Sequence, residues 1–154
     1  MLTQTRLKEI LYWNDENFIW IYGNKKNHIA GSKHAKGYRS IRIDGKSYLE
    51  HRLVWLWFYG CFPCLDLDHI DRNKENNKIS NLREATNAQN HQNQNIRVNN
   101  TSGSTGIHFR KDCQKWRAAI KVNGKQIYLG YFAEKSLAIA ARKQAEKLFH
   151  PFQS

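Results

Sequence analysis

Hydrophobic and polar positions in the first 60 residues predict a small sheet followed by a helix. The apolar run 18–22 predicts a strand, and residues 38–43 and 46–49 predict two further strands. The dipeptide between the latter two, Asp44-Gly45, is typical of a type I′ hairpin turn. The apolar and aromatic run 53–59, with a glycine directly after it, then predicts a buried helix.

The pattern changes sharply over residues 66–100. Ten asparagines lie between positions 73 and 100, and large apolar side chains are few. This composition is typical either of a flexible tract or of a site held together by polar contacts. Among these asparagines, Asn76 and Asn77 are predicted to close a loop through bonds from side chain to backbone.

Regular patterning returns near the end of the chain. Residues 107–111, 116–122 and 126–131 predict a three-stranded antiparallel meander, and Asn123-Gly124 supplies a second type I′ turn. Apolar residues then recur at helical spacing between Leu137 and Leu148. One face of the sheet can be covered by this helix, and the other is left for a partner.

Together these elements predict an α+β fold with two small domains. Residues 1–96 would form the first domain, with the polar finger at about 64–95, residues 97–101 would be a linker, and residues 102–154 would hold the sheet and helix. A chain of 154 residues is too short for the large α/β enzyme architectures.

Charge points to the kind of partner. The formal net charge is +12, and residues 102–154 alone carry 10 basic and 3 acidic side chains, so the meander is predicted to bind a polyanion. No apolar run is long enough for a membrane span, and the start of the chain lacks a signal-peptide pattern. We therefore expect a soluble, cytoplasmic protein that does not bind membranes.

Three cysteines are too few for a disulfide framework and fit a reducing compartment. Cys61 and Cys64 have the CxxC spacing of zinc sites, but a structural zinc ion needs two further ligands and only Cys113 remains. A zinc-stabilised interaction module is thus an alternative of low weight, and structural zinc is not expected.

The polar segment contains the groups that phosphodiester hydrolysis requires. Asp68 and Asn90 offer hard oxygen ligands suited to Mg²⁺ or Mn²⁺, and His69 offers a base near physiological pH. Around them lies an ordered series of motifs: Gly37-Tyr38, Asp44-Gly45-Lys46, His51-Arg52-Leu53-Val54, Asp68-His69-Ile70-Asp71, Asn76-Asn77 and Asn81-Leu82-Arg83. This series resembles the HNH endonucleases, in particular the phage and intron-encoded homing type with an asparagine-rich ββα-metal finger.

The resemblance implies a role for each finger residue. His69 would be the general base, Asp68 a ligand of a single divalent ion, and Asn81 the middle residue that stabilises the loop and orients the base. Asn90 would be the second ligand, but His91 stands beside it, and only one of two helical neighbours can face the ion.

Four nearby residues receive weaker assignments. Asp66 and Asp71 fit loop acids better than ligands. His51 fits a structural role slightly better than a catalytic one, although it and Arg52 could reach a phosphate.

The C-terminal segment resembles the ethylene-response-factor (Apetala-2 type) DNA-binding domain. The matching residues are Gly106-Ile107, Arg110, Lys115-Trp116, Ala118, Ile120, Leu129-Gly130, Phe132, Ala138 and Ala141. The resemblance implies that the sheet enters the major groove. The residues predicted to face DNA are His108, Arg110, Trp116, Arg117, Lys121, Gln126 and Tyr128, although Trp116 and Arg117 cannot share one face in regular geometry.

These observations lead to a functional hypothesis. The protein would be a bacteriophage homing endonuclease that hydrolyses double-stranded DNA, by nicking or by double-strand cleavage, and leaves 5′-phosphate and 3′-hydroxyl ends. It would act in the cytoplasm of a bacterial or phage-infected cell as a monomer or homodimer. The alternative is a DNA-binding regulator whose HNH finger is inactive.

Overall fold

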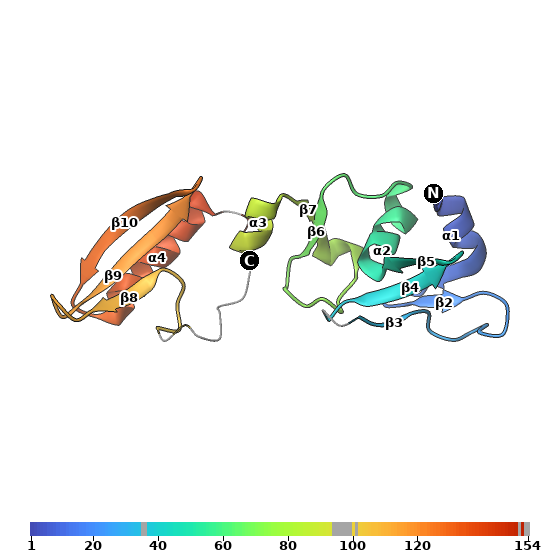
Figure 1. The fold of residues 1–154 in the computed structure, drawn as a ribbon, viewed down its shortest axis with the longest axis horizontal. Helices are drawn as coiled ribbons and strands as arrows, with labels where there is room; N and C mark the ends of the chain where they lie inside the picture. Colours follow the sequence, from blue (N-terminus) through green and yellow to red (C-terminus); the bar gives the residue numbers. More distant parts are fainter. Residues whose placement is uncertain (35–36, 94–99, 101, 151, 153–154) are drawn as a thin grey trace. The chain divides into compact units, whose positions relative to one another are not determined.

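The computed structural model describes the chain except for residues 35–36, 94–99, 101, 151 and 153–154. Its contacts divide into two compact units, Met1–Asn90 and His91–Ser154. The predicted linker, 97–101, falls almost wholly outside the described residues. Small antiparallel sheets and short helices make up both units (Figure 1), which confirms the predicted α+β class.

The elements are short. The helices are α1 (Gln4–Ile10), α2 (Glu50–Tyr59), α3 (Asn87–Gln92) and α4 (Lys135–Phe149), and a 3₁₀ turn, η1, spans Ile79–Asn81. The strands are β1 (Leu11–Trp13), β2 (Phe18–Trp20), β3 (Ser32–Lys33), β4 (Arg39–Ile43), β5 (Lys46–Leu49), β6 (Asp66–His69), β7 (Leu82–Ala85), β8 (Ile107–Arg110), β9 (Lys115–Val122) and β10 (Lys125–Phe132). Within the described ranges, no helix combines the length and apolar character needed to cross a bilayer.

The first unit is built around α2. This helix packs against α1 and against the sheet formed by β3, β4 and β5. Phe18, Ile41 and Leu53 are fully buried in the shared core, and each such side chain contributes about 1.5–3 kcal/mol relative to exposure. This core supports the finger, because Leu82 of β7 belongs to the same cluster.

Two predicted turn signals of this unit are confirmed. Asp44 and Gly45 both have positive φ (47° and 79°), as a type I′ turn requires. α2 ends at Gly60, which has a φ of 77° and donates its backbone N–H to the carbonyl of Leu56. The helix begins at Glu50, three residues earlier than predicted, and this shift places an acidic side chain inside the unit.

The sequence pattern did not reveal the two elements that open the chain. α1 begins after Thr3, whose hydroxyl accepts a hydrogen bond from the backbone N–H of Arg6 at 3.2 Å. β1 pairs with β2, with Leu11 opposite Trp20. Both elements are short and bury few residues, so they leave little periodic signal.

The polar segment folds as two strands and a helix. β6 pairs antiparallel with β7, with Asp68 opposite Arg83 and His69 opposite Leu82. α3 starts with a reciprocal cap, because the side chain of Gln89 accepts from the backbone N–H of Thr86 while the Thr86 hydroxyl accepts from the N–H of Gln89. The cap places Asn90 in the first turn of α3.

In the second unit the predicted meander is confirmed, with strand order β10-β9-β8 and a type I′ turn at Asn123 and Gly124. α4 packs on one face of this sheet. The predicted apolar stripe of α4 is partly wrong, since Leu137 and Leu148 are 53% and 76% exposed. The small side chain of Ala138 lies in the core instead, because the sheet leaves little room beneath the helix.

Candidate active site

A buried histidine lies at the centre of the finger. His69, the last residue of β6, is almost fully buried, and its Nε2 lies 2.9 Å from Oδ1 of Asn77. Asn77 is equally buried. This contact corrects a prediction: Asn77 was expected to bond to the backbone of its loop, but its side chain bridges two other side chains.

The second partner of Asn77 determines which way its amide points. Nδ2 of Asn77 donates to Oε2 of Glu50 at 3.0 Å, and the same oxygen accepts from Nε of Arg39 at 2.8 Å. An oxygen that accepts from an arginine is an acceptor whether or not the carboxyl is protonated. The amide nitrogen of Asn77 therefore faces Glu50, and its oxygen faces the histidine.

This orientation defines the tautomer of His69. An amide oxygen only accepts, so Nε2 of a neutral His69 must carry the hydrogen. The lone pair then lies on Nδ1, which is the atom that can take a proton. Four side chains, Arg39, Glu50, Asn77 and His69, thus form a chain of hydrogen bonds that ends at a basic ring nitrogen.

Two rings surround this histidine. The ring of His51 lies edge-on to that of His69 with centroids 5.2 Å apart, and Tyr38 contacts both imidazoles. Burial lowers the pKa of His51 to about 3, and the nearby His69 and Arg52 add to the effect, so His51 is neutral at physiological pH. Burial raises the pKa of Tyr38, and Asp68 contributes through its charge. The rings of His51 and Tyr38 therefore pack around His69.

Asp68 lies next to His69 but projects to the other face of the hairpin. Arg83 is directly opposite and donates two hydrogen bonds to Oδ2 of Asp68, from Nε at 3.0 Å and from Nη2 at 2.9 Å. Both side chains are largely buried. The arginine therefore holds the carboxylate in one orientation.

Asn90 provides an observation relevant to metal binding. Its Oδ1 is buried and has no hydrogen-bond partner among the described residues, which is costly unless a ligand binds there. Within the described part of the chain no group of three or more His, Cys, Asp or Glu could hold a metal ion. A site made by one carboxylate and one amide oxygen would suit a hard cation that keeps several waters, and Asp68 and Asn90 fit that description.

The two alternative ligands are adjacent in α3. The side chain of His91 is exposed, whereas Asn90 is half-buried and carries the orphaned oxygen. Neighbours in a helix point about 100° apart. The burial pattern therefore favours Asn90 over His91.

Asn81 stabilises the loop between β6 and β7. Its Oδ1 accepts from the backbone N–H of Asp71, while Nδ2 donates to Oδ1 of Asp71 and to the carbonyl of Asn76. The side chain of Asn76 also donates to Asp71, rather than to backbone as predicted. Hydrogen bonds to Asn76, Asn73 and Asn81 outweigh desolvation and lower the pKa of Asp71. Asp71 is thus a charged residue that anchors the loop, and Asn77 is the side chain that contacts His69.

A surface pocket of about 440 Å³ opens beside β6. Asp66 and Ala85, which are paired across the β6–β7 ladder, form part of its wall. Arg52 of α2, Thr86 and Asn87 at the start of α3, and Cys64 and Leu65 before β6 form the rest. Asp66 shares its strand face with Asp68, so the pocket adjoins the carboxylate and has one cation in its wall.

The cysteine side chains, all in described parts of the chain, show no sign of a metal site, although Cys64 also lines the pocket beside β6. Cys61, Cys64 and Cys113 all have free, exposed thiols. The backbone N–H groups of Cys64 and Leu65 donate to Glu84 of β7. The segment that leads into β6 is therefore held to β7 by backbone N–H groups.

Cross-strand pairing shows which residues share the outer face of the meander. Arg117 lies opposite both His108 and Tyr131, and directly opposed residues share a face. Lys121 lies opposite Gln126, and a register shift after Tyr128 keeps Tyr128 on the same side as Tyr131. The outer face defined in this way holds His108, Arg110, Lys115, Arg117, Ala119, Lys121, Gln126, Tyr128 and Tyr131.

Trp116 lies on the opposite face, which corrects its predicted orientation. It pairs with Phe109 and Phe132 and packs against the core of the second unit. Nζ of Lys135 in α4 lies 5.4 Å from its ring. Of these two neighbours, Arg117 therefore lies on the outer face and Trp116 lies on the face that packs against the core.

Two arginines of the outer face differ in their contacts. Arg110 donates two hydrogen bonds to Asp112, at 3.0 and 2.7 Å, so a neighbouring carboxylate offsets its charge. Arg117 lies over the ring of Tyr128 at 5.5 Å, and its buried Nε has no hydrogen-bond partner among the described residues. Sequence reasoning had not included Lys115 and Tyr131, whose position follows from the register.

Comparisons with known proteins found a family model, a relative and a solved structure that resemble this chain. Residues 48–92 match the family model of HNH endonucleases. Protein 3.8 of Escherichia phage T7 is 38% identical over 89 residues, which cover 57% of this chain and 74% of that protein. A structure of the HNH homing endonuclease I-HmuI, solved to show DNA binding and cleavage, aligns with 89% of this chain and 82% of its own, at 22% identity and a TM-score of 0.45.

The chain therefore carries an HNH endonuclease domain, which spans β5, α2, the loop and both strands of the finger, and α3. It belongs to the same protein family as Protein 3.8 of phage T7. The family match lies around the buried histidine and ends at residue 92.

Proposed function

We propose that this protein is a divalent-metal-dependent endonuclease of the homing type that hydrolyses phosphodiester bonds in double-stranded DNA. The observation that carries the proposal is the contact between His69 and Asn77. A buried asparagine, held by the Glu50 carboxylate that Arg39 in turn binds, gives His69 one tautomer and one orientation. A general base needs a lone pair held in one position, and this arrangement supplies it.

In the proposed reaction, Nδ1 of His69 takes a proton from the attacking water. The positive charge that forms on the ring is stabilised by the hydrogen bond from Nε2 to Oδ1 of Asn77. General base catalysis of this kind contributes about 10²- to 10⁴-fold. The products would be a 5′-phosphate and a 3′-hydroxyl.

Asp68 and the orphaned oxygen of Asn90 would hold one Mg²⁺ or Mn²⁺ ion. When bound, such an ion stabilises negative charge on the phosphate and on the leaving oxygen. Arg83 keeps the Asp68 carboxylate oriented. Arg52, in the pocket beside β6, would bind a phosphate of the substrate strand.

The outer face of the meander would hold the DNA near the finger. His108, Arg117 and Lys121 offer donors on one side of a sheet narrow enough for the major groove. Gln126 and Tyr128 lie beside them, as an Apetala-2-like mode of binding would require. Trp116 has no part in this surface.

A plasmid cleavage assay tests the proposal. Supercoiled plasmid is incubated with the full chain and Mg²⁺ or Mn²⁺, alongside His69→Ala and Asp68→Ala. We expect nicked or linear product from the wild type, and loss of cleavage with retained DNA binding in both variants. Cleavage by His69→Ala at the wild-type rate would contradict the role of His69.

The same assay separates the alternative account. A DNA-binding regulator with an inactive finger would bind plasmid and leave it intact with either metal. An end-labelled product resolves the 5′-phosphate from a 5′-hydroxyl, and sedimentation with DNA resolves a monomer from a homodimer. We place the activity in the cytoplasm of a bacterial or phage-infected cell, where this substrate is found.

A further inference from the structure

A second concave surface lies in the first unit, between the outer face of the β3-β4-β5 sheet and the loop that follows β2. Its volume is about 560 Å³. Ser32, Ser40 and Ser47 line it with hydroxyls, and Lys25 and Arg42 line it with cations. The proposed nuclease mechanism uses none of these residues.

The positive charge of this surface is not balanced by nearby acids. Residues 20–47 contain seven Lys or Arg and a single acid, Asp44, and Asp44 is paired with Arg6. Elsewhere in the segment, acids pair with Lys33 and Arg39. Neither Lys25 nor Arg42 has an acidic partner among the described residues. Two uncompensated cations in one hollow favour an anionic ligand.

The backbone gives this hollow a defined floor. Arg42 lies opposite Ser47 in the β4–β5 ladder, so the two side chains share the outer face of the sheet. Gly31 has a φ of 83°, and a Cβ there would lie 2.5 Å from the carbonyl oxygen of Ser40. A glycine is therefore needed for the loop to approach β4 this closely.

The chemistry of the lining fits a phosphodiester backbone. Hydroxyl, lysine and arginine donors are the groups that bind phosphate oxygens, and they read no sequence. Trp20 and the exposed Ile29 add an apolar edge that suits a sugar. His28, also in the lining, is exposed.

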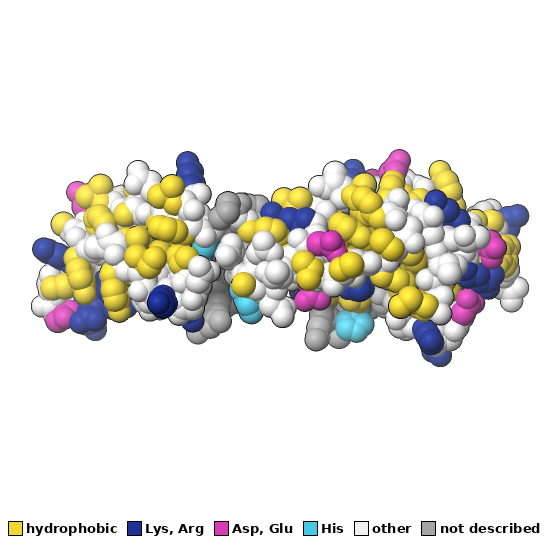
Figure 2. All heavy atoms as spheres, turned by 90° about the horizontal axis from the view of Figure 1, so that it is seen from above, with side chains coloured by type: hydrophobic (Ala, Val, Ile, Leu, Met, Phe, Trp, Pro, Cys, Tyr) yellow, Lys and Arg dark blue, Asp and Glu magenta, His cyan; other side chains and the backbone are white. Residues whose placement is uncertain are grey.

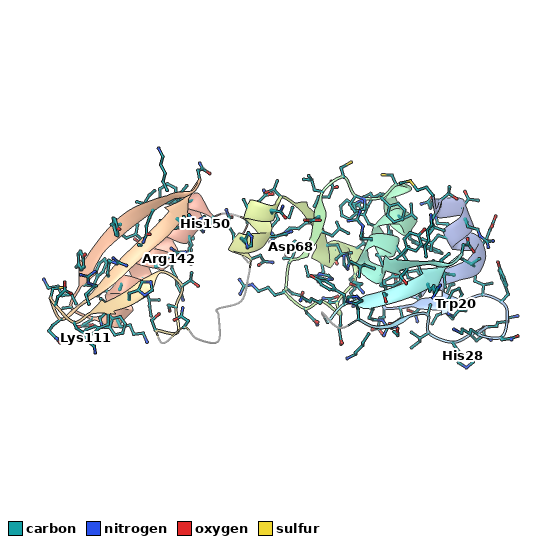
Figure 3. The ribbon with its side chains drawn as sticks, in the orientation of Figure 1. Trp20, His28, Asp68, Lys111, Arg142 and His150 are labelled. Carbon is teal, nitrogen blue, oxygen red and sulfur yellow. The ribbon has the colours of Figure 1, made fainter. Side chains whose placement is uncertain are left out.

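This surface is separate from the finger. Figure 3 shows Trp20 and His28 at the end of the first unit that lies away from Asp68. Figure 2 views that unit from the opposite side to β3, and the surface seen there carries acidic as well as basic side chains. The positive charge of the hollow is therefore local, because the opposite face of the unit is not uniformly basic.

We propose that this hollow, defined by Lys25, Arg42 and the three serines, is a second binding site for the DNA backbone, which holds the duplex at a distance from the cleavage point. The proposal rests on the nuclease function proposed above. It predicts a substrate footprint longer than the finger alone requires, with two phosphate contacts at this site.

The test measures the salt dependence of duplex binding by fluorescence anisotropy. Each phosphate contact contributes about 0.9 to the slope of log K against log salt concentration. The double substitution Lys25→Gln and Arg42→Gln in the full chain should therefore reduce the slope by about two. The matched control is Lys143→Gln with Lys147→Gln, which removes two exposed cations of α4 and should leave the slope unchanged.

The outcomes are distinct. If the variant with Lys25→Gln and Arg42→Gln keeps the full slope, this proposal is overturned. Wild-type plasmid cleavage, measured in parallel, would still support the nuclease function. If the wild type neither cleaves nor binds DNA, this proposal and the proposed nuclease function both fail.

Calorimetry with a nucleoside triphosphate tests another ligand for the hollow. Nucleotide binding that the double substitution abolishes, with an unchanged duplex slope, would assign the hollow to a free nucleotide instead. A charge-retaining variant, Arg42→Lys, should keep most of the slope.

Discussion

Arg83 donates two hydrogen bonds to one oxygen of Asp68 across the β6–β7 ladder. A ligand carboxylate held in this way binds a cation without first losing rotational freedom. Residues that orient a metal ligand typically change metal affinity 10- to 100-fold when mutated. The arginine also adds a positive charge near the proposed ion, which opposes binding.

The Arg83→Met variant decides between these effects. We expect the Mg²⁺ concentration for half-maximal cleavage to rise about 10-fold or more, because loss of orientation outweighs relief of repulsion. Titration of Mg²⁺ in the plasmid assay measures it. A lower Mg²⁺ requirement in the variant would mean that charge repulsion is the larger effect.

Asn77 allows a test of the proposed tautomer. Asn77→Leu retains the side-chain size but removes the acceptor for Nε2 of His69, so the single-turnover cleavage rate should fall by about 10²-fold or more. DNA affinity should stay within about twofold, because the residue is buried. Asn77→Asp retains an acceptor that faces His69 and should recover part of the rate.

The comparison of these two variants excludes a purely structural role. Both leave Glu50 without its amide donor, so both should lower the free energy of unfolding by about 1–3 kcal/mol. Equal cleavage rates in the leucine and aspartate variants would contradict the tautomer assignment.

His51 predicts an acid limit to stability. Its pKa is about 3 in the folded protein and about 6.5 in an unfolded chain, so the unfolded chain binds an extra proton between these values. Stability from this group is therefore complete above pH 6.5 and falls as the pH drops towards 3, by up to about 1.4 kcal/mol per pH unit. Urea unfolding of the full chain at pH 7.5, 6 and 5 measures this slope.

His51→Leu should remove most of that pH dependence, because it cannot be protonated. The facing groups His69, Tyr38 and Arg52 remain in the variant. His28→Asn, which replaces an exposed imidazole, is the matched control and should keep the wild-type slope. An unchanged slope in His51→Leu would show that another group titrates.

The sequence predicted local structure well and side-chain partners poorly. Gly60 and the two Xaa-Gly turns are backbone signals that act within a few residues, and the structure confirms all three. The contact between Glu50 and Asn77 joins residues 27 apart, and it depends on how α2 docks on the loop. A periodic pattern contains no information about such docking.

The same distinction explains the errors at the sheet. Alternation showed that Trp116 and Arg117 point to opposite faces, but it could not tell which face α4 covers. Trp116 lies opposite Phe132 and packs against the cluster that contains Ala118 and Ala138 of α4. Trp116 is therefore on the face that α4 covers. In the finger, His69 stood out by its motif, whereas Asn77 was one asparagine among ten.

A pair of substitutions in the meander tests the outer face. Arg117→Gln removes a cation whose Nε is unsatisfied in the free protein, so duplex affinity should fall and the salt slope should decrease by about 0.9. Trp116→Ala removes a half-buried core ring and should lower the free energy of unfolding by about 2 kcal/mol without a change in slope. Anisotropy titrations across salt concentrations, together with urea melts, separate the two effects. Reduced duplex affinity in Trp116→Ala at full folding would place the tryptophan, and with it the other sheet face, against DNA.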